Sequence, residues 1–527
     1  MENGQTKQIY KGALLLTLTG LLSKVLSAGY RIPLQNITGD IGFYIYQQIY
    51  PVLGIAMMLS LYGFPTAISK LVAEHKEEGN EPSLPSFYLP IFCLLISINT
   101  ILFVGLFIYS DKIAGWMGDI HLSKSIRMSA YIFLIIPFTS IIRGVFQGNN
   151  NMVPTAISQV IEQVVRVSII LFTAILLIQQ GENLYEIGSG AALGSIFGAV
   201  ITFISLLFFW IKSKPIGSRS YPFKWLTYFR VVIIYGICIS VNHMLLLLMQ
   251  FSDAFTLVPN LVNAGATLAE AKQWKGILDR GQPLIQLGTV LGSSLALALI
   301  PQVTKNRLKL YPEVFKAHIQ SAFKISFYLS IAATVGLVII FPYVNILLFR
   351  DDNGSFALRL LACTIIFTSL VITIASVLQG LGYVYRTAVF ILLGVCAKSI
   401  LNYMLIPLYG IEGSALATLM SVLFVLFLNI SQLKKILPNT RLLIIPWRAF
   451  STALSFMVIF LIIMNQFFFE IFQITSRLDY LGYVLLVSIL GALSYIIILV
   501  KLKGFTNEEL QGLPFGELLI EAMQRRK

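Results

Sequence analysis

The sequence predicts an all-helical protein that crosses a membrane fourteen times, and two observations support this fold class. Hydrophobic residues make up 57% of the 527 residues and charged residues only 12%, about half the charged fraction of a soluble domain. The apolar residues also form long runs, and the basic residues are concentrated in alternate loops between them. This composition excludes a water-soluble enzyme and a nucleic-acid-binding domain.

Each predicted span is a run of roughly 20 mainly apolar residues, the length that an α-helix needs to cross a bilayer. Such a run must be helical, because the hydrocarbon core offers no water to the backbone groups. The ninth run is long, and it is either tilted or broken near Pro342. The runs lie near residues 12–32, 44–69, 85–109, 127–148, 154–179, 187–211, 226–249, 280–303, 318–349, 356–382, 385–406, 411–433, 446–468 and 480–502.

The basic residues predict the orientation of these spans. If the N-terminus is cytoplasmic, the inward-facing loops and tails hold 22 Lys and Arg residues and the outward loops hold 6. Lys and Arg gather on the cytoplasmic side of membrane proteins, so both termini are predicted to be cytoplasmic. The net charge of +14 is then mainly topological. The longest loop, about 250–279, faces outward and contains a helix-prone run at 266–274.

The two halves of the chain resemble each other at a fixed offset. The sequence Val-Phe-Gln-Gly at 145–148 recurs as Val-Leu-Gln-Gly at 377–380, and the same offset of 232 relates Pro51 to Pro283. Six helices per repeat is an even number, so the repeats are parallel and related by an axis along the membrane normal. The predicted domains are a six-helix lobe at 1–215, a second at 216–436, helices thirteen and fourteen at 437–503, and a cytoplasmic tail at 504–527.

Several of these regions carry features with more than one interpretation. The tail is predicted either as an amphipathic helix on the membrane surface or as a disordered end. The stripe Gly190, Gly194 and Gly198 predicts close helix packing. Two similar lobes that face each other would leave a central cleft, and rocking of one lobe against the other would give alternating access.

Ionisable residues within the spans are candidates for a substrate site, because a charge at the bilayer centre costs roughly 2.5–3.5 kcal/mol and usually lines a cavity or has a partner. Six cations stand against two acids, so complete pairing among them fails and an anionic cargo is indicated. Arginine binds phosphate through two parallel hydrogen bonds. The candidates are Lys24, Arg31, Arg143, Glu162, Arg166, Asp279, Arg280 and Lys398.

The alternative for each charge is a local partner. Glu162 and Arg166 are four residues apart on one helix, so they are expected to be able to form a salt bridge. The repeat offset relates Arg166 to Lys398, and the two cations are predicted either to hold one diphosphate from opposite lobes or to bond within their own helices. His243 and Asp253 are expected to be helix-end or satisfied residues.

Residues 143–148 (Arg-Gly-Val-Phe-Gln-Gly), residues 154–163 and Arg166 resemble the signature of polysaccharide-biosynthesis and stage V sporulation protein B-like membrane proteins. Asp279 and Arg280, followed by Pro283, are similar to the eighth helix of lipid II flippases. These families belong to the multidrug/oligosaccharidyl-lipid/polysaccharide (MOP) flippase superfamily.

This resemblance implies two lobes around a V-shaped cationic cavity, with two extra helices beside a lipid-facing groove. It also implies a monomeric transporter in the bacterial cytoplasmic membrane, not an enzyme, which carries an undecaprenyl-pyrophosphate-linked sugar such as lipid II. The roles of first-helix cations and of the eighth-helix Asp-Arg pair carry over to Lys24, Arg31, Asp279 and Arg280. The expected partners are this sugar lipid and membrane lipids, with no nucleic acid and no cofactor.

The driving force is left open between a monovalent cation and the membrane potential. A cation-coupled multidrug exporter of the same fold is the alternative function. Such exporters have twelve spans and an acidic cavity, in contrast to the fourteen spans and basic cleft predicted here. A membrane glycosyltransferase is a third hypothesis, but it would need catalytic acids or histidines in a sizeable loop, and the sequence shows neither.

Overall fold

In the computed structural model, every regular element of the described residues is a helix. The structure describes residues 18–79, 83–213, 225–298, 308, 310–438, 440–471, 476–506 and 509. The chain divides into two compact units, and each is described by itself. The first unit is Met1–Asp279 with Val384–Leu408, and the second is Arg280–Tyr383 with Tyr409–Lys527.

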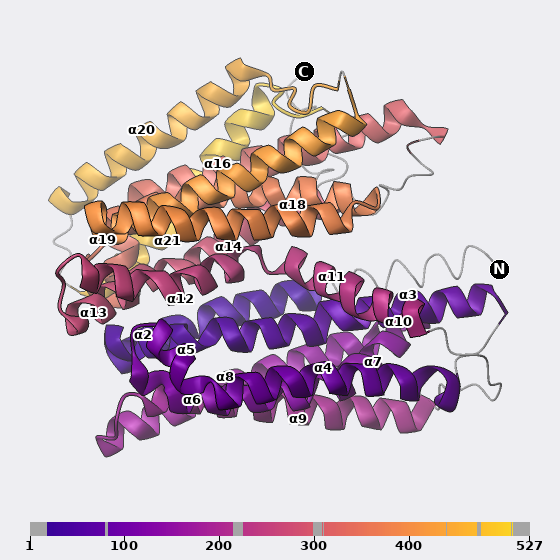
Figure 1. Cartoon of the computed structure of the whole chain (residues 1–527). Helices are drawn as coiled ribbons and strands as arrows, with labels where there is room; N and C mark the ends of the chain where they lie inside the picture. The colour runs from indigo at the N-terminus through magenta and orange to yellow at the C-terminus, as the bar shows by residue number, and fades with distance from the viewer. Residues whose placement is uncertain are drawn as a thin grey trace. The chain divides into compact units, whose positions relative to one another are not determined.

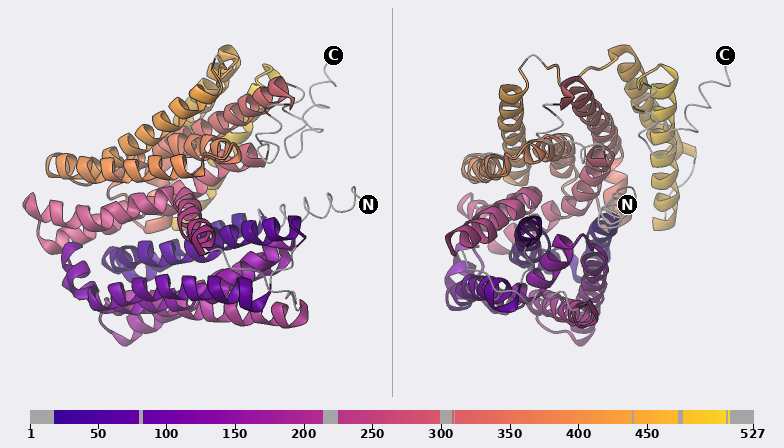
Figure 2. Two further views of the ribbon diagram at one scale, coloured as in Figure 1. Left: turned by 45° about the vertical axis from the view of Figure 1, so that its right-hand side comes forward. Right: turned by 90° about the vertical axis from the view of Figure 1, so that its right-hand side faces the viewer.

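The helices of the first unit are shown in Figure 1 and, from two further directions, in Figure 2. They are α2 (Arg31–Met58), η1 (Leu59–Gly63), α3 (Phe64–Glu77), η2 (Leu84–Tyr88), α4 (Leu89–Ile108), α5 (Ser110–Trp116), η3 (Ile120–Leu122), α6 (Ser123–Ala130), η4 (Tyr131–Leu134), α7 (Ile136–Gly148), α8 (Val153–Gln180), α9 (Glu186–Ser213), α10 (Trp225–Phe229), η5 (Arg230–Tyr235), α11 (Gly236–His243), α12 (Leu245–Asn263), α13 (Leu268–Asp279) and the first part of α19 (Val384–Ile436).

The second unit contains the rest of α19 and the remaining helices. These are α14 (Gly281–Ala298), α16 (Pro312–Phe349), α17 (Ser355–Ala362), α18 (Thr364–Gly380), α20 (Trp447–Ile471) and α21 (Arg477–Lys501). Helix α16 packs against α14, α18, α20 and α21, and it continues through Pro342 without a break. Of the predicted tail, most of 504–527 lies outside the described residues.

Within the described part of the chain, twelve helical segments are long and apolar enough to cross a membrane. The protein is therefore an all-helical polytopic membrane protein. The number differs from fourteen for three reasons. Leu18–Glu77 and Val384–Ile436 each cover two predicted spans, the predicted seventh span is divided at His243 into two segments, and α14, at the predicted eighth span, is not among the twelve.

The two longest segments are each interrupted by one glycine. Leu18–Glu77 has 60 residues, and a straight helix of that length would measure roughly 90 Å, about three times the hydrocarbon core. Gly39 (φ 68°, ψ −175°) and Gly410 (φ 58°, ψ −132°) leave the helical conformation. Glycine adopts these backbone angles without the strain that a Cβ atom would add.

Glycines also allow the close contact between α8 and α9 in the first unit. A Cβ atom added to Gly198 would lie 3.0 Å from the carbonyl oxygen of Glu162, and one added to Gly194 would lie 3.1 Å from that of Arg166. The predicted packing stripe is thereby confirmed. It places the backbone of α9 directly against the turns of α8 that carry Glu162 and Arg166.

The prediction of a long outward loop at 250–279 is wrong. Helix α12 continues to Asn263, and α13 follows after a short turn, which confirms only the helix-prone run at 266–274. Helix α13 packs against α2 so closely that a Cβ atom added to Gly276 would lie 2.2 Å from the carbonyl oxygen of Asp40.

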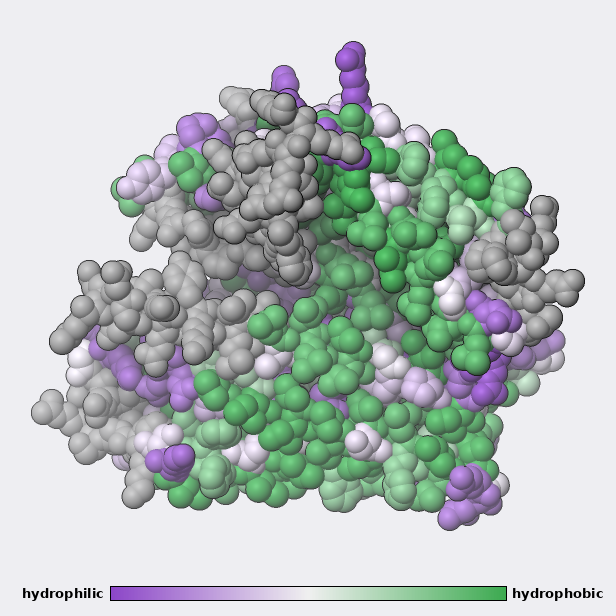
Figure 3. All heavy atoms as spheres, turned by 180° about the vertical axis from the view of Figure 1, so that it is seen from behind, coloured by the Kyte–Doolittle hydropathy of each residue, from purple (hydrophilic) through white to green (hydrophobic). Residues whose placement is uncertain are grey.

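Exposed hydrophobic side chains cover much of the described surface on the face seen in Figure 3. Such side chains occur on both units, and Ile101, Phe208 and Phe427 are each more than half exposed. Lipid tails are as apolar as these side chains, so a membrane protein can expose them to the bilayer. The described surface therefore agrees with a protein embedded in a membrane.

Candidate anion-binding site

Arg31 is the first residue of α2 and is 1% exposed. The break at Gly39 returns the chain so that the Arg31 guanidinium lies 4.0 Å from the centre of the Tyr50 ring. Its polar neighbours are the phenols of Tyr30, Tyr46 and Tyr50. Among the described residues, no carboxylate pairs with Arg31, and none of its three nitrogens has a hydrogen bond of normal geometry. Arg31 is therefore a buried cation with no anionic partner among the residues that the structure describes.

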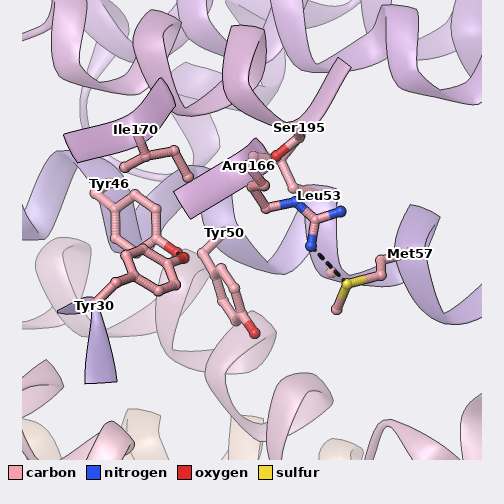
Figure 4. Close-up of a pocket in the computed structure, with 9 residues that line it drawn as sticks. Tyr30, Tyr46, Tyr50, Leu53, Met57, Arg166, Ile170 and Ser195 are labelled. Atoms are coloured by element: carbon pink, nitrogen blue, oxygen red, sulfur yellow. Dashed lines mark hydrogen bonds between the residues drawn. The ribbon is translucent and has the colours of Figure 1, made fainter. Parts of the chain in front are cut away.

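The three tyrosines line a small pocket together with Arg166 (Figure 4). The hydroxyl groups of Tyr30 and Tyr46 are hydrogen-bonded to each other. The Arg166 guanidinium points toward Met57, and its Nη1 lies 2.7 Å from the Met57 sulfur. The sulfur is a weak acceptor, so this contact leaves much of the hydrogen-bonding capacity of Arg166 for a better one.

Glu162 is shared between two arginines. Its Oε2 accepts from Arg143 Nη2 at 2.9 Å, and its Oε1 accepts from Arg166 Nη2 at 2.5 Å. Arg143 also donates to the Ser158 hydroxyl at 3.2 Å and to the Ser60 carbonyl at 3.3 Å. The salt bridge expected between Glu162 and Arg166 is confirmed. This Arg143–Glu162–Arg166 triad retains one net positive charge.

Lys398 has a carboxylate partner that the cation count left out. Its ammonium lies 2.5 Å from Asp253 Oδ2 and donates to the Met249 carbonyl at 2.9 Å. The other Asp253 oxygen accepts from Asn402 Nδ2 at 2.9 Å. The expectation that Asp253 is a satisfied residue is confirmed. The proposed clamp on a diphosphate by Arg166 and Lys398 would require both cations to leave carboxylate partners.

The neighbours Asp279 and Arg280 do not pair with each other. Asp279, in the first unit, accepts from Lys275 through both oxygens, at 2.6 and 2.5 Å. Arg280, in the second unit, binds Asp351 through two parallel contacts, at 2.6 and 3.0 Å. Burial raises the pKa of Asp351, but hydrogen bonds from Arg280 and from the Asn353 amide outweigh it, so the pKa is lowered from its usual value.

Lys24 lies in the helical segment before α2 and is exposed. No carboxylate lies within salt-bridge distance of it in the part of the chain that the structure describes. Four of the six candidate cations thus have acidic partners. Two of these acids, Asp253 and Asp351, were not included in the sequence count. Arg31 and Lys24 have none within the described ranges. The first unit accordingly combines these two cations with the triad, which adds a third net positive charge.

The residues that the sequence analysis missed are mainly aromatic. Tyr30, Tyr46 and Tyr50 surround Arg31, but tyrosines near a membrane interface are too common to indicate a site. Ser60 and Met57 come into contact with the triad through η1 and the end of α2. No group of three or more His, Cys, Asp or Glu side chains that could hold a metal occurs in the described ranges.

Comparison with known proteins agrees with this architecture. The model of the family described as "Polysaccharide biosynthesis protein" matches residues 9–307. The chain is 40% identical to the uncharacterized membrane protein YabM of Bacillus subtilis (strain 168), over 98% of this chain and 97% of that protein. It is 25% identical to the lipid II flippase MurJ of the same organism, over 82% of this chain and 83% of MurJ.

Two kinds of solved structure share the fold. One is a lipid II flippase MurJ in an inward closed conformation, with a TM-score of 0.67, 14% identity and coverage of 92% of this chain and 98% of that one. The other is an inward-facing multidrug resistance MATE family transporter, with a TM-score of 0.57, 15% identity and coverage of 78% and 96%. The chain belongs to the polysaccharide biosynthesis protein family, and it shares its fold with the lipid II flippase MurJ and with MATE family transporters.

Proposed function

We propose that this transporter flips an undecaprenyl-pyrophosphate-linked saccharide, such as lipid II or another cell-envelope precursor, across the bacterial cytoplasmic membrane. The observation that carries the proposal is Arg31. Its guanidinium is 1% exposed and faces three phenols without a carboxylate among the described residues. A buried charge is costly unless it is paired, and the planar guanidinium fork matches the oxygens of a phosphate group.

The charge of the first unit supports a cargo with more than one negative charge. Arg31 and Lys24 have no acidic partner in the described residues, and the Arg143–Glu162–Arg166 triad keeps one net positive charge. A diphosphate ester is anionic over the physiological pH range and presents several acceptor oxygens. Arg166 could then exchange its contact with the Met57 sulfur for a phosphate oxygen, which is a much stronger acceptor.

The proposed transport cycle is alternating access by two six-helix lobes, residues 1–215 and 216–436, around a V-shaped cavity. Helices thirteen and fourteen (437–503) would border a lipid-facing groove, and both termini would be cytoplasmic, including the tail at 504–527. The offset of 232 and the loop charges support this arrangement, as does the likeness to MurJ. In this cycle Arg280 would contact the cargo only after it leaves Asp351.

A cation-coupled multidrug exporter is the second candidate, because the chain shares its fold with MATE transporters. An exporter of cationic drugs needs a carboxylate that is available to the drug. Within the described residues, the acids Glu162, Asp253 and Asp279 are each bound to Arg or Lys at 2.5–2.9 Å. This pairing favours an anionic cargo over a cationic one.

A flipping assay with defined substrates separates the two candidates. The purified protein is placed in liposomes with fluorescent undecaprenyl-pyrophosphate-linked saccharides, and exposure of each lipid on the opposite leaflet is followed by quenching. We expect flipping of at least one such lipid and no export of a cationic dye from the same vesicles. Dye export driven by a sodium or proton gradient, with no lipid flipping, would overturn the proposal in favour of the exporter.

A further inference from the structure

The start of α20 and the end of α21 lie at the same end of the second unit. Helices α16, α20 and α21 pack against one another (Figure 1). Tyr483 of α21 donates a hydrogen bond to Asn465 of α20, and a Cβ atom added to Gly491 of α21 would lie 3.1 Å from Leu461 of α20. The two helices therefore run antiparallel, and Lys501, the last residue of α21, lies level with the first turn of α20.

Helix α16 holds both of these helix ends. The Tyr328 ring stacks on the Phe450 ring, with ring centres 5.5 Å apart and planes inclined by 10°. The same tyrosine meets the Phe505 ring edge-on, at 5.4 Å. The segment before α20 is also attached to α16, because Gln320 Nε2 donates to the Arg441 carbonyl at 2.8 Å. The two segments are thus anchored to one stretch of α16.

These segments carry exposed basic side chains, and in the described part of the chain no carboxylate lies within salt-bridge distance of them. We call these residues the basic patch: Arg441, Arg448, Lys501 and Lys503. Two lysines on α16 differ from them. Lys316 pairs with Glu313 at 2.8 Å, and Lys324 pairs with Glu509 at 2.8 Å. The positive charge of the basic patch is therefore available to an anion from outside the protein.

Large apolar side chains lie next to the basic patch in the sequence and are exposed with it. Trp447, Ile444 and Leu502 are 62%, 54% and 47% exposed. The Trp447 ring is edge-on to the Phe450 ring at 6.0 Å, which fixes it at the start of α20. Tryptophan favours the interface between the bilayer and water. A surface that combines such a ring with cations suits an anionic amphiphile better than a free inorganic anion.

Lys503 occupies a backbone position that favours glycine. Helix α21 ends in a Schellman motif, in which the Gly504 amide donates to the Leu499 carbonyl at 2.7 Å and the Lys503 amide to the Val500 carbonyl at 3.1 Å. Lys503 is the left-handed residue of this motif, with a φ of 57°, where glycine is usual because it has no Cβ atom. Strain of this kind is typical of residues that contact a ligand, and a lipid phosphate would give the exposed lysine such a contact.

We propose that the basic patch and Trp447 bind the headgroup of an anionic phospholipid, with the lipid phosphate on the cations and its glycerol and acyl chains against the apolar side chains. A basic residue near an anionic membrane surface contributes about fivefold in affinity. A zwitterionic phospholipid carries a cation beside its phosphate, so it should gain much less. The bound lipid would tie the start of α20 to the end of α21. This inference is independent of the cargo that the protein carries.

Native mass spectrometry of the full chain in detergent measures the affinity for phosphatidylglycerol and for phosphatidylcholine with the same acyl chains. We expect the unsubstituted protein to prefer phosphatidylglycerol. The triple variant Arg448→Gln/Lys501→Gln/Lys503→Gln should lose this preference, by about fivefold for each cation removed. All three side chains are exposed, so the variant should fold, and its unfolding temperature in detergent checks this.

Cations near the ends of spans also set the orientation of a membrane protein, so the matched control removes the same charge elsewhere. Lys70→Gln/Arg127→Gln/Lys124→Gln removes three exposed cations of the first unit that already have acidic partners, and it should keep the preference for phosphatidylglycerol. An equal loss in this control would show attraction by net charge alone and would overturn the proposal. Unchanged affinity in the triple variant of the basic patch would overturn it as well.

Lys503→Gly separates binding from folding. It relieves the strain of the left-handed position, so the unfolding temperature should stay the same or rise, while the affinity for phosphatidylglycerol falls about fivefold. A purely structural lysine would not give this combination. Competition with farnesyl-diphosphate-linked N-acetylglucosamine tests the source of the phosphate. We expect this probe to leave phosphatidylglycerol bound, and its displacement of the phospholipid from the patch would assign the surface to a diphosphate lipid and overturn the proposal.

Discussion

At the scale of single residues, Glu162 and Arg31 show two different ways of keeping a charge inside a membrane protein. Glu162 is bound by Arg143 and Arg166, so its negative charge is compensated twice. Arg31 is equally buried but lies among phenols. Removal of one partner from a buried ion pair leaves an uncompensated charge, whereas removal of an unpaired charge does not. Stability measurements should therefore distinguish the two residues.

The first prediction concerns this contrast. Glu162→Gln should lower the free energy of unfolding by about 3–5 kcal/mol, because both arginines lose their carboxylate. Arg31→Gln should leave the stability unchanged or raise it. Thermal unfolding in detergent, followed by fluorescence, measures both variants. Equal destabilisation of the two would mean that Arg31 is held by a structural partner and does not serve to bind an anion.

The second prediction concerns Asp253 and Lys398. Asp253→Leu and Lys398→Met should each destabilise the protein by about 3–5 kcal/mol, whereas the double variant Asp253→Leu/Lys398→Met should lose much less than their sum. The exposed pair Lys124 and Glu186, at 2.6 Å, is the matched control and should show a coupling energy below about 1 kcal/mol. Additive losses at Asp253 and Lys398 would contradict the ion pair.

The sequence could predict the Glu162–Arg166 bridge but not the Asp253–Lys398 pair. Residues four apart on a helix must lie on one face, so the first contact follows from spacing alone. Asp253 and Lys398 are 145 residues apart, and only the packing of α12 against α19 brings them together. For this reason the count of six cations against two acids overstated the number of unpaired charges. The two candidate cations that have no acidic partner in the described residues are Arg31 and Lys24.

At the scale of helices, single glycines decide where the chain reverses. The sequence predicted a connection at about 33–43 between the first two spans, and the structure is helical up to Thr38 and again from Asp40. The reversal is confined to Gly39, whose φ of 68° and ψ of −175° lie in a region that is essentially restricted to glycine. Hydropathy alone does not distinguish such a one-residue turn from a loop.

The third prediction tests this turn. Gly39→Ala should destabilise the protein by about 1–3 kcal/mol through backbone strain, since an added Cβ atom at this position would meet nothing within 4 Å. Gly105→Ala, in the last turn of α4, is the matched control: it also has open space but a helical backbone, so it should be neutral or slightly stabilising. Equal unfolding temperatures for the two variants would exclude strain at Gly39.

Helix α13 shows why the sequence misjudged the region 250–279. Its lysines made the segment look like a solvated loop, but Lys272 lies 2.8 Å from Asp119 and Lys275 lies 2.5 Å from Asp279. These long-range and local pairs allow a charged helix to be buried against α2. Composition records the charges but does not show that they are compensated.

At the scale of the whole molecule, composition and loop charge identified the class of protein. The low charged fraction and the apolar runs follow directly from the cost of placing polar groups in lipid, and the helical, polytopic structure confirms that inference. The repeat offset of 232 relates the two halves without showing how they move. Orientation in the membrane remains a prediction from the charge asymmetry.

The fourth prediction concerns this orientation. In a cysteine-free variant, Asp352→Cys, in the exposed turn between α16 and α17, should react with a membrane-impermeant maleimide from outside intact cells. Asn151→Cys, in the exposed turn between α7 and α8, is the matched control and should react only after the membrane is permeabilised. A reporter fused after Lys527 should be cytoplasmic. Labelling in the opposite pattern would reverse the proposed topology.

The most direct test of the proposed function is the effect of Arg31 on lipid flipping. In liposomes with an undecaprenyl-pyrophosphate-linked saccharide that the unsubstituted protein flips, Arg31→Gln should lower the initial rate about a hundredfold or more, as expected for the loss of a charge-assisted contact of roughly 3 kcal/mol. Arg31→Lys should retain part of the rate, because it keeps the charge but loses the planar fork. Full flipping activity of Arg31→Gln at normal abundance and stability would contradict the account.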